Sequence, residues 1–177
     1  MSAVSFRPSN RQAGEGTEYS RALAQNERRA ARIDMSPLPK PPGRRLAVLA
    51  CMDSRLTVEE ILDLRTGDAH IIRNAGGLAT DDAIRSLVIS QTLLGTEEVL
   101  VIEHTDCGML TFEDAVVRAD LANRTGASVD LPLLPFSDLE QNLKKQVELI
   151  RSHPWVQDVP IHGLIYEVET GRLRPVD

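Results

Sequence analysis

The chain lacks both a long apolar segment and a concentration of positive charge. No stretch of its 177 residues approaches the ~20 consecutive apolar residues of a membrane span, and the N-terminus lacks the apolar core of a secretory signal. We therefore expect a cytoplasmic protein without a membrane partner. The formal charge of −6 and the isoelectric point near 5.3 argue against a general nucleic-acid binder, which needs a basic surface to neutralise phosphates.

Cysteine is also scarce, with two residues in the whole chain. A structural disulfide is disfavoured in a reducing compartment. The two thiols are therefore core fillers, metal ligands or nucleophiles, and their neighbours decide among these roles.

The apolar content of 42% fits one globular domain with an additional arm. Residues 1–43 are predicted to form the arm, with a helix at about 17–33 that Thr17 caps and a proline-rich linker after it. The apolar stripe of this helix is thin, which suits a helix that lies on another surface. Residues 44–177 are predicted to form an α/β domain.

Short apolar runs alternate with capped helices from Leu46 onward, which is typical of a parallel α/β sheet. We expect a mostly parallel sheet of about four strands plus an antiparallel edge strand, with helices on both faces and an N-terminal helical arm. The predicted strands are 46–51, 69–73, 99–103 and a closing hairpin of 161–168 and 172–176. One predicted helix starts at a capping box of Thr57 and Glu60 and ends at Gly67, and a second runs from Thr80 to Gly95. A third starts at about Thr111. A fourth starts at Ser137 and directs Leu143, Val147 and Ile150 towards the core.

Two cysteines and a histidine fall at the ends of predicted strands. Cys51 ends the first strand, and His104 and Cys107 follow the third. If these strands are neighbours, the three side chains converge where doubly wound sheets bind ligands. Thiolate and imidazole are the donors that zinc prefers, and three ligands leave one position for water. Taken singly, each residue is better explained as part of the core, so the prediction rests on the whole constellation.

Four segments make a more specific pattern. They are CMDSRL at 51–56, GDAHIIRNAGG at 67–77, DDAIRS at 81–86 and HTDCGM at 104–109. In these segments, over about residues 44–112, the chain resembles the β-class carbonic anhydrases, and their compact archaeal-type subclass in particular. The resemblance implies that Cys51, His104 and Cys107 bind one Zn²⁺ per chain and that Asp53 and Arg55 form a catalytic dyad. It implies hydration of carbon dioxide to bicarbonate by a zinc-bound hydroxide. It also implies a homodimer or higher homo-oligomer with the pocket at the subunit interface.

The dyad also has a physical rationale. A carboxylate two residues from a zinc ligand can itself occupy the open metal position, and the planar fork of Arg55 is suited to hold Asp53 back. Asp106 lies between two proposed ligands, where it either orients His104 or caps the following helix. Gly76 and Gly77 serve a tight turn or a close approach of substrate.

Three other functions compete with carbonic anhydrase. A carbon disulfide or carbonyl sulfide hydrolase would use the same zinc motif, and a long, narrow apolar tunnel would favour it over an open cleft. A non-catalytic zinc module would need a fourth protein ligand, for which Asp53 is the nearby candidate. A thiol enzyme would use Cys107 as nucleophile and His104 as base, and would stay active without zinc.

Overall fold

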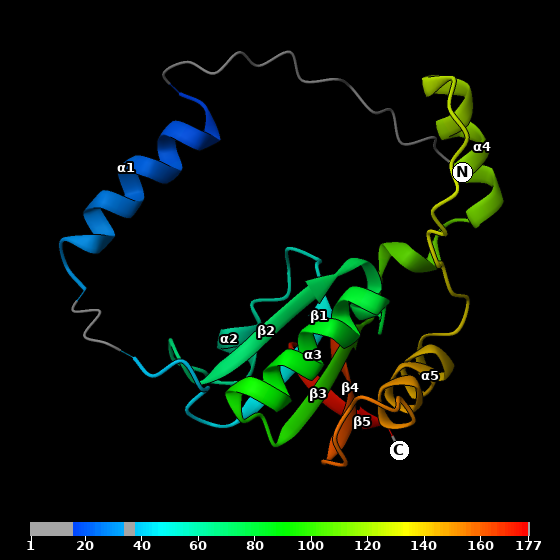
Figure 1. Cartoon of the computed structure of the whole chain (residues 1–177). Coiled ribbons are helices and arrows are strands. Elements are labelled where there is room, and N and C mark those ends of the chain that lie inside the picture. The colour runs from blue at the N-terminus through cyan, green and yellow to red at the C-terminus, as the bar shows by residue number, and fades with distance from the viewer. Residues whose placement is uncertain (1–15, 34–37, 177) are drawn as a thin grey trace. The chain divides into compact units, whose positions relative to one another are not determined.

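The computed structural model describes residues 16–33 and 38–176 (Figure 1). The chain divides into two units, residues 1–38 and 39–177. In the first unit, α1 (Glu18–Ala30) begins after Thr17, whose side chain accepts a hydrogen bond from the Ser20 backbone N–H. The helix ends before the predicted residue 33, and it buries none of its side chains. Residues 34–37 of the predicted linker lie outside the described residues.

The second unit is built on a five-stranded sheet in the order β2-β1-β3-β4-β5 (Figure 1). Its strands are β1 (Leu46–Cys51), β2 (Ala69–Asn74), β3 (Glu98–His104), β4 (Ile161–Glu167) and β5 (Arg172–Val176). β1 pairs in parallel with β2 and β3, β3 pairs in parallel with β4, and β5 adds an antiparallel edge. The predicted sheet is confirmed.

The two faces of the sheet are covered unequally. α3 (Asp81–Leu94) and α5 (Leu139–Arg151) lie on one face, where Leu87, Leu143 and Ile150 are fully buried against strand residues such as Leu49. The other face is covered by the single-turn α2 (Val58–Ile61) and by loops. Many apolar side chains on this second face are only partly buried. Helices therefore lie on both faces, as predicted, but the second face is the less protected one.

Local capping determines the ends of two helices. Thr80 caps α3 by accepting from the Ala83 N–H, and Gly95 ends it with a left-handed φ of 73°, both as predicted. The predicted start of α5 at Ser137 is wrong by one residue. Asp138 is the cap, because its carboxylate accepts the hydrogen bond of the Gln141 N–H.

Two predicted helix boundaries are wrong. α2 ends at Ile61, well before Gly67, and its capping box is incomplete, since the Thr57 hydroxyl donates to the Glu60 carboxylate and makes no cap to the backbone. Asp63 then takes a left-handed φ of 48°, which stops helical geometry. α4 (Asp114–Thr125) begins later than Thr111 because residues 108–110 form a separate 3-10 turn, η2 (Gly108–Leu110). α4 buries none of its side chains.

Gly77 lets a turn approach the sheet closely. It ends the 3-10 turn η1 (Ala75–Gly77) with a φ of 70°. A Cβ atom there would lie 3.0 Å from both the Cys51 nitrogen and the Ile102 oxygen, which belong to the backbones of β1 and β3. Only glycine combines this conformation with this contact.

None of the described helices has the length and apolar character that would let it cross a membrane. The sequence likewise contains no long apolar run.

Gly77→Ala is expected to lower the free energy of unfolding by about 3 kcal/mol, because it adds left-handed strain to overpacking against two backbones. Gly95→Ala is the matched control: its φ is 73° and no atom lies within 4 Å of the added Cβ, so only about 1 kcal/mol is expected. Urea unfolding of both variants measures the difference. Equal losses would mean that the close approach at Gly77 has no energetic weight.

Candidate metal centre

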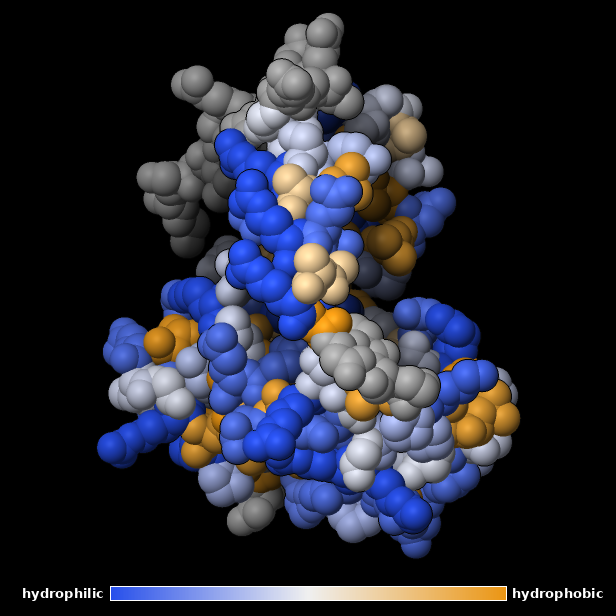
Figure 2. All heavy atoms as spheres, turned by 90° about the vertical axis from the view of Figure 1, so that its left-hand side faces the viewer, coloured by the Kyte–Doolittle hydropathy of each residue, from blue (hydrophilic) through white to orange (hydrophobic). Residues whose placement is uncertain are grey.

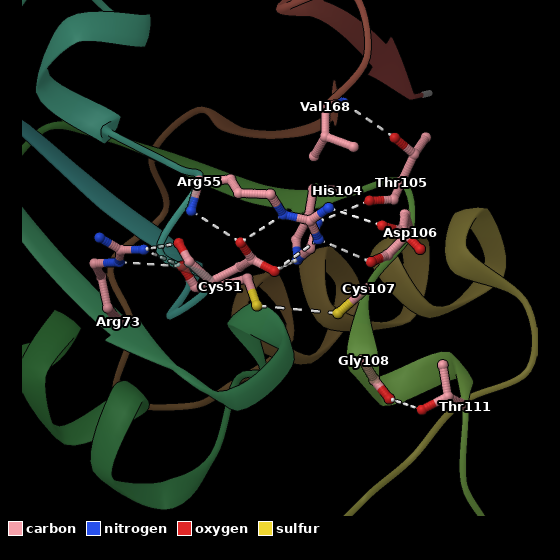
Figure 3. Close-up of polar contacts among 11 residues, drawn as sticks. Cys51, Arg55, Arg73, His104, Thr105, Asp106, Cys107, Gly108, Thr111 and Val168 are labelled. Atoms are coloured by element: carbon pink, nitrogen blue, oxygen red, sulfur yellow. Dashed lines mark hydrogen bonds and ion pairs between the residues drawn. The ribbon is translucent and has the colours of Figure 1, made fainter. Parts of the chain in front are cut away.

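The sheet brings three metal-binding side chains together. Cys51 is the last residue of β1 and His104 the last of β3, and these strands are parallel neighbours with Ala50 opposite Ile102. Cys107 follows His104 in the loop before η2. The chain reverses its strand order between β1 and β3, so the cluster lies at a topological switch point, as predicted (Figure 3).

The spacing of the donor atoms suits zinc. The two sulfur atoms and a ring nitrogen of His104 all lie within 4.8 Å of one another, and the Sγ atoms are 4.0 Å apart. A tetrahedral zinc ion with Zn–S bonds of ~2.3 Å separates two sulfurs by about 3.8 Å. All three residues are buried. The cluster therefore has the chemistry and the dimensions of a three-ligand zinc site.

His104 is held in the form that a metal ligand needs. Its Nδ1 lies 2.8 Å from the Thr105 carbonyl oxygen, which can only accept, so Nδ1 carries the hydrogen. Its Nε2 then has a lone pair, and this buried atom has no hydrogen-bond partner within the described residues. A metal ion between the sulfurs would satisfy this nitrogen.

The two thiols do not share their charge equally. A hydrogen bond from the Cys107 thiol, with a smaller contribution from His104, lowers the pKa of Cys51 to about 4 although burial opposes this. The same interaction with Cys51, together with burial, raises the pKa of Cys107. A dication bound between the two thiols would favour deprotonation of both.

Asp53 and Arg55 form a bidentate pair, and Arg55 lies beside the cluster (Figure 3). Arg55 donates from Nε to Asp53 Oδ1 at 2.9 Å and from Nη2 to Oδ2 at 2.8 Å, and its backbone N–H also donates to Oδ1. These bonds hold the pKa of Asp53 well below its usual range. Asp53 Oδ2 lies 3.8 Å from the Nε2 atom of His104, so a carboxylate stands next to the place of a metal without being bound there.

A cavity of about 430 Å³ opens in front of the cluster. Its lining includes both cysteines, Asp53 and Arg55, and apolar atoms from Met52, Ala75, Gly76, Met109 and others. Met52 is 64% exposed, so the cavity opens to solvent in the described chain. Gly76 has a φ of 85°, which the predicted tight turn requires, and it lines the cavity; a close approach of substrate to it stays a prediction.

Asp106 has neither of its two predicted roles. The Thr105 carbonyl orients His104, and the next α-helix begins only at Asp114. The Asp106 carboxylate accepts a hydrogen bond from Arg55 Nη1 at 2.7 Å. Arg55 follows β1 and Asp106 follows β3, so this contact could be recognised only once the pairing of the two strands was known.

Sequence reasoning missed Arg73. Its guanidinium donates from Nη2 to the carbonyl oxygens of Cys51 at 2.9 Å and Asp53 at 2.6 Å, and so fastens the loop that carries the dyad. The parallel register of β1 and β2 explains this contact, because it sets Arg73 opposite Ala50, the residue before Cys51.

Glu103 is a buried acid that stays out of the cluster. It precedes His104 on β3, so strand alternation directs it to the opposite face. There its Oε1 accepts a hydrogen bond from Asn142 of α5 at 2.7 Å. Burial raises the pKa of Glu103 to about 8. Among the described residues, Asp53 is therefore the carboxylate positioned to compete for a metal.

Comparison with known proteins agrees with this geometry. The family model for carbonic anhydrase matches residues 46–131. The chain is 42% identical to β-carbonic anhydrase 1 of Mycobacterium tuberculosis over 141 residues, which covers 79% of this chain and 86% of that protein. It is 45% identical to a carbon disulfide hydrolase of Acidithiobacillus thiooxidans over 157 residues, which covers 76% of this chain and 78% of that protein.

Solved structures show the same likeness. The crystal structure of a carbonic anhydrase from Streptococcus mutans superposes with a TM-score of 0.87 at 42% identity, covering 91% of this chain and 98% of that one. A carbonic anhydrase from Glaciozyma antarctica gives a TM-score of 0.82 at 45% identity, covering 90% and 98%. Sequence, sheet topology and the Cys-His-Cys cluster thus agree: the chain belongs to the β-carbonic anhydrase family of enzymes.

Proposed function

We propose that this protein is a zinc-dependent enzyme that hydrates carbon dioxide reversibly to bicarbonate, with one Zn²⁺ held by Cys51, His104 and Cys107. The observation that carries the proposal is a buried three-donor cluster whose two cysteines line a cavity, with an aspartate held beside it. Three ligands leave the fourth tetrahedral position for water, which is the arrangement of catalytic zinc sites. Bound zinc would supply Lewis acidity, which makes water a nucleophile near neutral pH.

The protein side chains would bind and orient the reactants. Asp53, ionised because Arg55 lowers its pKa, would accept a hydrogen bond from the reacting water and orient its oxygen. The apolar atoms of Met52, Ala75 and Met109 suit a small, uncharged substrate such as carbon dioxide. The lining residues include no histidine, so the released proton would pass to water or buffer.

Within a single chain, the described cavity has an open shape that suits carbon dioxide. A carbon disulfide or carbonyl sulfide hydrolase would be favoured by a long, narrow apolar tunnel. The described chain instead has an open cavity, at whose rim Met52 and Arg55 remain accessible to solvent. A non-catalytic zinc module would need a fourth protein ligand, and Arg55 holds the one nearby candidate away.

We further propose that the protein is a homodimer or larger homo-oligomer in the cytoplasm, where reducing conditions keep both thiols free for zinc. Apolar residues of the second sheet face, such as Ile71, Leu100 and Leu164, are only partly buried. α1 has no buried residue and exposes Tyr19 and Leu23. On the face drawn in Figure 2, apolar areas also alternate with hydrophilic ones. Burying such surface against a second copy would be favourable.

The charge distribution supports the same assembly. Residues 1–33 contain six arginines and three acidic residues, whereas the whole chain has a formal charge of −6. A basic arm and an acidic remainder attract each other between two copies of the chain.

Zinc content tests the ligand set. Wild-type protein is expected to hold about one zinc per chain, and Cys51→Ser or His104→Ala less than about a tenth of that, because each change removes one of three donors. His162→Ala, which changes an exposed histidine, is the control and retains the metal. Elemental analysis by mass spectrometry gives the counts. Full zinc in Cys51→Ser would contradict the site.

Activity tests the reaction. Stopped-flow measurement is expected to show carbon dioxide hydration that disappears on chelation and returns with zinc, which a thiol enzyme would not do. Asp53→Asn should lower kcat/KM roughly hundredfold because the acceptor charge is lost. The matched control Asp82→Asn changes an aspartate paired with Arg85 outside the cavity lining, and should leave the rate unchanged. Faster release of sulfide from carbon disulfide would favour the rival substrate.

Light scattering tests the assembly. Tyr19→Ser combined with Leu23→Ser should shift the particle from a dimer or larger species towards the monomer, because it removes the exposed apolar face of α1. Glu27→Ser is the control, since it alters the same helix outside that apolar pair. A wild-type protein that is monomeric and fully active would refute the proposed interface.

A further inference from the structure

Arg55 contacts a second acidic residue besides Asp53. Its Nη1 donates to Asp106 Oδ2 at 2.7 Å, and its Nη2 donates to the Asp106 backbone carbonyl at 3.0 Å (Figure 3). Asp53 follows β1 and Asp106 follows β3. The guanidinium therefore lies between two carboxylates that come from neighbouring strands.

The two contacts divide the donors of Arg55. Nε and one hydrogen of Nη2 bind Asp53, while Nη1 and the other hydrogen of Nη2 bind Asp106. If Asp53 were its only partner, a movement of Asp53 towards His104 would leave the guanidinium without an anchor. With Asp106 present, the position of Arg55 does not depend on Asp53.

Asp106 stands on a fixed part of the backbone. The preceding Thr105 donates its N–H to the Tyr166 carbonyl at 3.0 Å, and the Thr105 hydroxyl accepts from the Val168 N–H at 3.1 Å. Asp106 itself has a φ of 55°, a left-handed conformation that aspartate tolerates better than most residues. The anchor is thus tied to β4 and the segment after it, which lie outside the dyad.

We propose that Asp106 is a positioning residue that anchors Arg55, so that Arg55 can keep Asp53 out of the fourth metal position. The inference rests on the proposed function, since it concerns the same zinc site. Asp53 Oδ2 is already 3.8 Å from His104 Nε2, so a small displacement of the carboxylate would bring it to the metal. The Asp106 side chain is 76% exposed, and its ion pair therefore adds little to the stability of the fold.

Substitutions at residue 106 separate positioning from folding. Asp106→Ala should lower kcat/KM for carbon dioxide about tenfold while zinc content and melting temperature stay at wild-type values. Asp106→Asn keeps an oxygen acceptor for Nη1 and should recover most of the loss. Asp120→Ala removes a similarly exposed carboxylate, which pairs with Arg124 on α4, and should change none of these quantities. An unchanged rate in Asp106→Ala would overturn the proposal.

A double-mutant cycle tests whether Asp106 acts through Arg55. In an Arg55→Ala background, adding Asp106→Ala should cost no further activity, because the group that it anchors is gone. A further tenfold loss there would show that Asp106 acts on something else, and the proposal would fail.

A crystal structure of zinc-loaded Asp106→Ala gives a readout that does not depend on the reaction. We expect Arg55 to leave its wild-type position and Asp53 to approach the metal. If both side chains stay in place, the proposal is wrong even if the enzyme is active. If wild-type protein fails to hydrate carbon dioxide, the proposed function fails, and the movement of Arg55 still decides whether Asp106 anchors it.

Discussion

The parallel pairing of β1 with β3 is the constraint on which the site depends. It sets the carboxyl ends of two strands side by side and brings Cys51 to His104, although they are 53 positions apart in the sequence. The β1–β3 pair is buried through most of its length, so its position is maintained by the core. Gly77 fits against both strand backbones at this point, which leaves no space for a side chain. The geometry of the cluster is thus a property of the sheet rather than of a flexible loop.

Around the cluster, charge is controlled by hydrogen bonds from fixed partners. The Thr105 carbonyl sets the tautomer of His104, the Arg73 guanidinium fastens the carbonyls of the dyad loop, and Arg55 holds the Asp53 carboxylate. An uncompensated carboxylate so close to two thiols would either repel the thiolates or take the metal position. Arg55 prevents both outcomes by pairing with Asp53, and it keeps this carboxylate ionised as an acceptor beside the proposed nucleophile.

The unequal covering of the sheet connects the fold to its proposed assembly. α3 and α5 cover one face, whereas a single helical turn and loops leave many apolar side chains of the other face partly exposed. Within the described part of the second unit, this turn and these loops are the cover of that face. The cavity opens to solvent, and the rim residue Met52 is largely exposed, so a second subunit would complete protection of both surfaces.

Local hydrogen bonds and residue order made much of this protein predictable from its sequence. The caps at Thr17, Thr80 and Gly95 involve neighbours in the chain, and the apolar runs of the strands need only burial, so these features could be inferred without coordinates. The motifs around Cys51 and His104 indicated the three proposed metal ligands and the proposed dyad. The length of α2 and the cap of α5 were mispredicted because neighbouring side chains in the sequence could form more than one local hydrogen bond.

Only the tertiary structure decided how distant residues share partners. Asp106 binds Arg55 across 51 positions, and Arg73 reaches Cys51 across 22. Sequence spacing carries no information about such contacts, because their distances are set by strand register and by the path of the loops. The sequence by itself therefore determined which chemical groups are present and which elements carry them. The sheet decided which of these groups meet, since hydrogen bonds act only between atoms that folding has brought within about 3 Å.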